Sequence, residues 1–150
     1  MATAAMAHPA LSVEALLGGK RVLQAKPRTP LDWVSVIRHG ISSAAVDSLA
    51  KTIHVTQSEL AAALGIPERT LARRKKEGML NSEESTKLVR LARVVERAEK
   101  VFENLDAALD WLKSPNAALS GATPLSLLDT DIGAESVLDT LGRIEHGVFA

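Results

Sequence analysis

Residues 57–77 have the sequence QSELAAALGIPERTLARRKKE, a pattern typical of a helix-turn-helix. Two helices that cross closely need a small residue at their contact, and Ala61 provides one. Gly65 follows four residues later, where the turn often needs a left-handed backbone. Apolar residues occupy the flanking core positions, which are Leu60, Leu64, Ile66 and Leu71. The set in this register predicts a helix-turn-helix.

The second helix of this motif is basic and is predicted to contact DNA. The first residues of a recognition helix normally reach base edges, and arginine can bind guanine with two hydrogen bonds. We therefore expect base contacts from Arg69, Thr70 and Arg73. Lys75 and Lys76 are expected to neutralise phosphates.

Three further positions complete the predicted DNA-binding set. Gln57 and Ser58 begin the first helix and could bind phosphate through their side chains and free N–H groups. Arg74 stands where this motif usually has an apolar residue, because it shares a helix face with Leu71. Its stem could cover the core, or its head could pair with an acid. The alternative for the whole surface is a solvated basic face without a DNA role.

The rest of the chain predicts an all-α fold. A helix is expected to begin at Thr29 or Pro30 and to end near Gly40, with Trp33, Val34, Ile37 and Ile41 on one face. Further helices are predicted over residues 44–52, 82–103, 105–112, from Thr123-Pro124 onward and 133–146, with Thr56 and Ser82 as N-caps. Leu11, Val13, Leu16 and Leu17 could form a short apolar helix face that Gly18-Gly19 ends, and Pro27 and Pro30 favour extended backbone in residues 20–30. Residues 1–30 as a whole are interpreted as an arm, partly disordered.

Composition excludes several functional classes. The 150 residues include no cysteine, which removes disulfides, thiol nucleophiles and thiolate metal sites and fits a cytoplasmic protein. No stretch reaches the roughly 18 apolar residues of a membrane span. The four histidines lack metal-binding spacing, and Asp129 and Asp131 look like a helix-capping turn with Thr130. We predict no catalytic residue, no metal, no cofactor and no enzyme activity.

Charge is unevenly distributed along a chain whose net charge is zero. Residues 51–100 hold 11 Lys/Arg against 7 Asp/Glu, whereas residues 101–150 hold 2 against 8. A basic middle and an acidic end suggest two surfaces with different partners.

The C-terminal third resembles the toxin-binding domain of the Xre/MbcA/ParS antitoxins. The residues that carry the resemblance are Trp111-Leu112, Pro115-Asn116, Leu119, Gly121, Pro124-Leu125, Leu127-Leu128, Thr130, Gly133, Arg143-Ile144, Gly147 and Val148. The helix-turn-helix and the segment EESTKLVRLA at residues 83–92 also look like this family. The resemblance covers roughly residues 30–150 and implies a helix-turn-helix region at 31–103 that also dimerises and a toxin-binding domain with its tail at 104–150. The arm at 1–30 lies outside it.

The resemblance also implies partners. It implies an antitoxin whose homodimers, with toxin bound, repress their own operon by binding operator DNA. It implies a RES-domain toxin, which consumes NAD or transfers ADP-ribose from it, and whose active-site cleft the C-terminal domain covers. The residues that we expect to contact the toxin are Arg143, Glu145, Gly147, Val148, Phe149 and Ala150.

Other functions fit the same residues. The chain could be a stand-alone repressor whose C-terminal domain only dimerises, or an inhibitor whose helix-turn-helix no longer binds DNA. Residues 143–150 could also be a frayed terminus.

Overall fold

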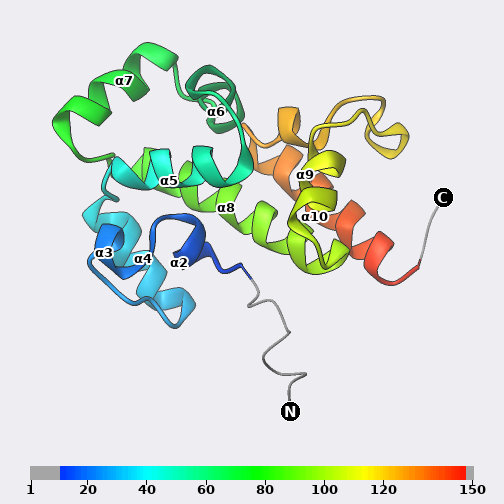
Figure 1. Ribbon diagram of the computed structural model, residues 1–150, viewed down its shortest axis with the longest axis horizontal. Helices are drawn as coiled ribbons and strands as arrows, with labels where there is room; N and C mark the ends of the chain where they lie inside the picture. The colour runs from blue at the N-terminus through cyan, green and yellow to red at the C-terminus, as the bar shows by residue number, and fades with distance from the viewer. Residues whose placement is uncertain (1–10, 148–150) are drawn as a thin grey trace.

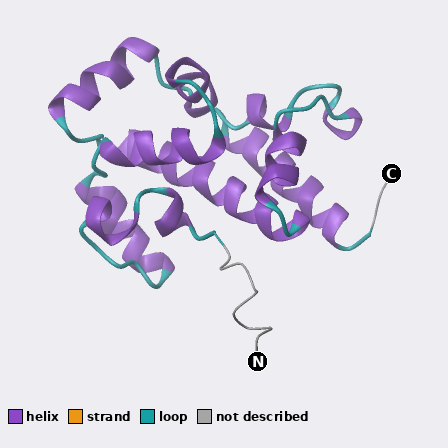
Figure 2. Ribbon diagram, viewed as in Figure 1, coloured by secondary structure: helices purple, strands orange, loops and turns teal. Residues whose placement is uncertain are grey.

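The computed structural model describes residues 11–147, and over this range the chain is helical (Figures 1 and 2). The only β pairing within these residues is an isolated antiparallel bridge between Ser42 and Met79. The predicted all-α class is confirmed. The elements are α2 (Val13–Leu16), α3 (Gly19–Leu23), α4 (Pro30–His39), α5 (Ala44–Ile53), α6 (Gln57–Leu64), α7 (Glu68–Glu77), α8 (Ser82–Phe102), α9 (Leu105–Leu112), the 3-10 helices η1 (Ala117–Leu119) and η2 (Pro124–Leu127), and α10 (Asp131–Glu145).

Local sequence sets where several of these helices begin. Thr56 caps α6, because its hydroxyl accepts from the Glu59 N–H while the Glu59 carboxylate accepts from the Thr56 N–H. Thr29 caps α4 in the same way, and the helix begins at Pro30, one of the two predicted start residues. The predicted cap at Ser82 is wrong by one residue. Asn81 is the N-cap of α8, and Glu84 completes its capping box.

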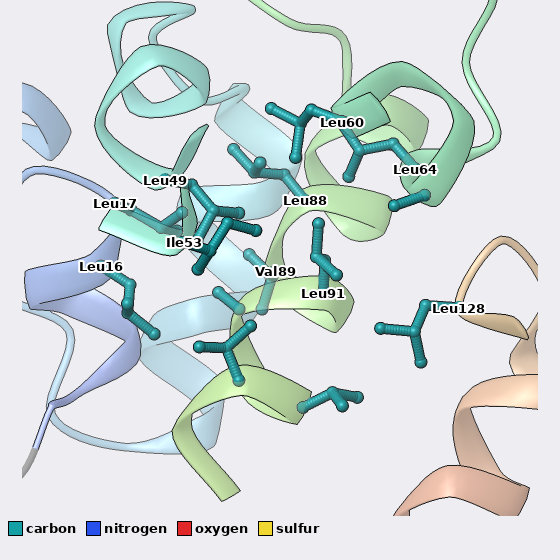
Figure 3. Close-up of a cluster of buried hydrophobic side chains, with 14 of the residues drawn as sticks. Leu16, Leu17, Leu49, Ile53, Leu60, Leu64, Leu88, Val89, Leu91 and Leu128 are labelled. Atoms are coloured by element: carbon teal, nitrogen blue, oxygen red, sulfur yellow. The ribbon is translucent and has the colours of Figure 1, made fainter. Parts of the chain in front are cut away.

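The long helix α8 runs through the middle of the molecule and supplies a core to both halves (Figure 1). On one side it packs against α2, α4 and α6, and on the other against α9 and α10. Its buried apolar residues belong to one continuous hydrophobic cluster that extends from Val13 to Leu141. Figure 3 shows part of this cluster. Leu88 lies beside Leu60, and Leu91 lies nearer to Leu128. One core therefore joins the helix-turn-helix to the C-terminal helices.

The expectation of a separate N-terminal arm is wrong for residues 13–23. These residues form α2 and α3, and Val13, Leu16 and Leu17 are buried in the core. The α2 backbone is also fixed by hydrogen bonds, because the Val13 N–H donates to Glu96 and the Ser48 hydroxyl donates to the Leu16 carbonyl. The apolar helix face that Val13, Leu16 and Leu17 offer in the sequence is therefore part of the core and not of a separate arm.

The predicted apolar face of α4 is only partly correct. Trp33 and Ile37 pack against the core, but Val34 is 38% exposed. Ile41 is buried, yet it lies beyond the end of α4 at His39. The helix ends at Gly40, which has a φ of 96°. The face that we expected to be wholly inward therefore leaves apolar surface exposed.

Candidate functional site: two surfaces at opposite ends

The helix-turn-helix has the geometry that its sequence predicts. Helix α6 ends at Gly65, whose φ of 71° is left-handed, and α7 begins three residues later. Ala61, Leu64, Ile66 and Leu71 are all buried. A side chain at Gly65 would lie 3.2 Å from the Asp129 Cβ, just before α10. Glycine is therefore favoured at position 65 for two reasons. Its backbone is left-handed, and a side chain there would crowd Asp129 of the C-terminal half.

Helix α7 presents its basic side chains to solvent. Leu71 is the only residue of this helix that is fully buried. Arg69, Arg73, Lys75 and Lys76 are exposed, and Thr70 is half-buried. Pro67 precedes the helix and provides no side-chain cap, which leaves the first N–H groups without a side-chain acceptor. A polyanion can therefore approach the first turn of α7 and its arginines together.

Arg74 differs from the other basic residues of α7. Its Nε donates to Glu84 at 2.8 Å and its Nη1 donates to Glu77 at 2.9 Å. Burial raises the pKa of Glu84, but the hydrogen bonds from Arg74 and from the Asn81 N–H outweigh burial and bring that pKa below its usual value. The guanidinium thus ties α7 to the start of α8, and its contact with DNA stays a prediction.

Two other cations of α7 make ion pairs at the surface of the molecule. Lys75 lies 2.9 Å from Asp47, and Arg73 lies 3.8 Å from Glu77. Both pairs are solvent-exposed, and exposed ion pairs contribute little stability and are screened by salt. Exchanging such a carboxylate for a phosphate therefore costs little.

The first turn of α6 contains the two remaining predicted residues. Ser58 is exposed. Gln57 is half-buried, and its Nε2 is buried without a hydrogen-bond partner among the described residues. Their contact with phosphate stays a prediction.

The other end of the molecule is formed by α10, far from α7 along the longest axis (Figure 1). Arg143 is exposed near the end of this helix, and Gly147 is exposed just after it. Glu145 pairs with Arg97 of α8, and the hydrogen bond from Arg97 lowers the pKa of Glu145. Glu145 is thus partly engaged within the chain. Val148, Phe149 and Ala150, predicted to contact the toxin, lie outside the described residues.

Two sets of contacts hold the start of α10, and the sequence predicted only the first of them. Thr130 caps the helix through the Gly133 N–H at 3.0 Å, so the interpretation of residues 129–131 as a capping turn is confirmed. Arg90 of α8 was missed: it donates to the Leu128 carbonyl and pairs with Asp131. The sequence indicates these contacts only through the spacing of Arg90 and Arg97, which lie seven residues apart and therefore on one face of α8.

Two kinds of site are absent from the described part of the chain. Residues 11–147 contain no cluster of three or more side chains suited to a metal ion. Over the same range, no helix is long and apolar enough to cross a bilayer.

Comparison with known proteins matches both halves. Residues 32–93 match the model of the antitoxin Xre-like helix-turn-helix domain, and residues 97–147 match that of the antitoxin Xre/MbcA/ParS C-terminal toxin-binding domain. Antitoxin Xre of Yersinia enterocolitica is 37% identical over 119 residues, which cover 78% of this chain and 80% of the relative. Antitoxin Xre of Photorhabdus laumondii is 32% identical over 118 residues, or 77% and 80% of the two chains. The Prs ADP-ribosylating antitoxin of a Sphingobium species is 30% identical over 132 residues, or 81% and 83%.

Proposed function

Since the chain belongs to the Xre/MbcA/ParS family of antitoxins, which act in toxin–antitoxin systems, we propose that it binds operator DNA through α7 and a RES-domain toxin through its C-terminal end. The observation that carries this proposal is the separation of the two surfaces. The exposed cations of α7 and the end of α10 lie at opposite ends of the molecule (Figure 1). Both partners can bind at once, and neither binding event requires catalysis.

On the DNA side, the argument rests on charge and access. The base-reading set is Arg69, Thr70 and Arg73, and the phosphate-binding set is Lys75, Lys76, Gln57 and Ser58. Helix-turn-helix proteins commonly bind operators as dimers, one recognition helix to each half-site. We therefore propose a homodimer that represses its own operon.

On the toxin side, the argument rests on the match over residues 97–147 and on the exposed end of α10. This match disfavours a stand-alone repressor whose C-terminal domain only dimerises. The proposed contacts are Arg143, Glu145 and the tail from Gly147 to Ala150, which we propose covers the active-site cleft of the toxin. The Sphingobium relative is named a Prs ADP-ribosylating antitoxin. ADP-ribose transfer is one of the two reactions that we propose for the RES-domain toxin.

The DNA surface is tested by the double change Arg69→Ala and Arg73→Ala. We expect operator affinity to fall about 100-fold, since each arginine contact to a base is worth roughly 1–3 kcal/mol. Toxin neutralisation should persist, because both side chains are exposed and distant from α10. Gel-shift titration and a growth-rescue assay measure the two outcomes.

The control for this test removes two positive charges elsewhere. Lys20→Ala with Arg21→Ala changes exposed residues of α3 by the same charge. Operator affinity in this variant should change by less than about threefold, at a salt concentration held constant. An equal loss of affinity in both variants would show that net charge, and not α7, determines DNA binding.

The toxin surface is tested by deleting Gly147 to Ala150. We expect the dissociation constant for the copurified RES-domain toxin to rise at least about tenfold, because the deleted segment includes the apolar pair Val148 and Phe149. Operator binding should be unchanged, so this variant and the α7 double variant serve as mutual controls. An unchanged dissociation constant in calorimetric titration would rule out the tail as part of the contact.

A further inference from the structure

Helix α7 is held against the rest of the molecule by few apolar contacts. It lies at the edge of the fold (Figure 1), and Leu71 is the only one of its ten residues that is buried. By comparison, nine residues of α8 are buried. Because apolar burial is the main force that packs one helix on another, a helix that buries so little depends on polar contacts for its position. The direction of α7 therefore depends on its hydrogen bonds and ion pairs.

The most buried of these polar contacts joins Arg74 to Glu84, the third residue of α8. The Glu84 side chain is only 9% exposed, and the Arg74 side chain is 22% exposed. One oxygen of Glu84 accepts from the Arg74 Nε at 2.8 Å and from the Asn81 N–H at 2.9 Å. A single carboxylate thus completes the capping box of α8 and binds the last turn of α7.

Burial distinguishes this pair from the ion pairs that Arg73 and Lys75 make at the surface. Water can replace the partners of those two cations at little cost. Without Arg74, the Glu84 carboxylate would keep only the Asn81 N–H among the described residues, at a site where burial disfavours a charge. Moving α7 away from α8 has the same consequence, because it separates the two charged groups. The pair therefore opposes a shift of α7 relative to α8.

The segment that follows α7 is fixed by backbone hydrogen bonds. The Ser43 N–H donates to the Gly78 carbonyl, and the Leu80 N–H donates to the Ile41 carbonyl, both at 2.9 Å. These bonds fix the point at which α7 ends, but a helix that is fixed at one end can still tilt about that end. Arg74 lies four residues before Gly78, about one turn earlier, and provides the second fixed point.

We propose that Glu84 is a positioning residue for operator recognition, because through Arg74 it holds α7 at the tilt that DNA binding requires. This inference rests on the proposed function, since it gives a buried residue a role in operator affinity. Arg69 lies nine residues before Gly78, or about 13 Å along the helix axis. A tilt of about 10° around Gly78 would therefore move Arg69 by roughly 2 Å, whereas binding groups must be held to within about 0.5 Å.

The test is Glu84→Gln in the full chain, with operator affinity measured by fluorescence anisotropy on a duplex of the promoter region of its own operon. Removing a negative charge beside a DNA-binding helix ordinarily raises affinity for DNA. We expect the opposite, a loss of about tenfold, because the neutral amide is a weaker acceptor for Arg74 than the carboxylate. Unchanged or higher affinity would overturn the proposal.

Glu83→Gln is the matched control for charge. Glu83 is the neighbouring residue on α8, and its side chain is 82% exposed. This change removes the same charge from almost the same place but leaves the contact between α7 and α8 intact. Operator affinity should stay within about threefold of the wild-type value or rise. A tenfold loss in this variant as well would mean that the Glu84 result is not specific to the buried pair.

A double-mutant cycle tests whether Glu84 acts through Arg74. In the Arg74→Gln background, Glu84→Gln should change operator affinity by less than about twofold, because the pair is already broken. If Glu84→Gln still costs about tenfold in that background, then the carboxylate acts by another route, which contradicts a positioning role through Arg74.

Hydrogen exchange of the free protein measures the position of α7 without DNA. In Glu84→Gln, the amides of α7 should exchange at least about tenfold faster, whereas those around Leu91 in the middle of α8 should keep their wild-type protection. Wild-type protection of α7, or an equal loss around Leu91, would overturn the proposal. A wild-type chain that does not bind the duplex would contradict the proposed function, while faster exchange in α7 alone would still show that Glu84 anchors this helix.

Discussion

Replacing Leu88 with alanine should lower the free energy of unfolding by about 3 kcal/mol, the usual cost of a leucine-to-alanine cavity in a packed core. Leu88 is fully buried on α8, next to Leu60 of α6 (Figure 3). For a domain of this size, that loss lowers the Tm by about 6–12 °C. Urea unfolding followed by circular dichroism measures the change.

The same variant tests whether the molecule has one core. Because the cluster around α8 continues from the helix-turn-helix into the C-terminal helices, both halves should unfold in one transition. Hydrogen exchange should therefore show amides of α6 and of α10 losing protection together. Two separate transitions would contradict a shared core. Ile132→Ala is the control, since an exposed isoleucine should contribute less than about 0.5 kcal/mol to the free energy of unfolding.

Replacing Gly133 with alanine should cost about 3 kcal/mol of unfolding free energy and weaken toxin binding. A Cβ at Gly133 would lie 1.9 Å from the Leu127 carbonyl oxygen, and backbone cannot give way as a flexible side chain can. The first turn of α10 would then have to separate from η2, which disturbs the Thr130 cap at the Gly133 N–H. Denaturant unfolding and toxin titration measure the two effects.

Gly142→Ala provides the control within the same helix. A Cβ at Gly142 meets no atom within 4 Å, and the residue lies inside α10. Alanine there should stabilise the protein by about 0.5–1 kcal/mol, because glycine costs conformational entropy in a helix. If Gly133→Ala is as stable as Gly142→Ala, then the close contact between α10 and η2 is not maintained in solution.

The helix-turn-helix and most helix boundaries were predictable because local chemistry determines them. The Thr56 and Glu59 capping box and the left-handed Gly65 are read from a few adjacent residues. The same is true of Thr130, whose hydroxyl caps α10. Where two neighbouring residues can both cap, as at Asn81 and Ser82, local sequence leaves the boundary uncertain by one residue.

The tertiary contacts were not predictable from one sequence. The position of Arg74 was recognised as irregular, but its acceptor Glu84 is identified only once α7 and α8 are placed together. Likewise, Arg97 and Glu145 are 48 residues apart and meet because α10 folds back along α8. The burial of Leu16 and Leu17 also depends on tertiary contacts, because α2 packs against α5 and α8, which are distant in sequence.

The continuity of α8 restricts how family members can exchange parts. The two matched domains end and begin at residues 93 and 97, which both lie inside the unbroken helix Ser82–Phe102. In a chimaera joined between these residues, part of α8 from one protein would have to pack against α9 and α10 of another protein. The two domains can therefore be recombined only between sequences whose α8 core residues pack equally well against the helices of both halves.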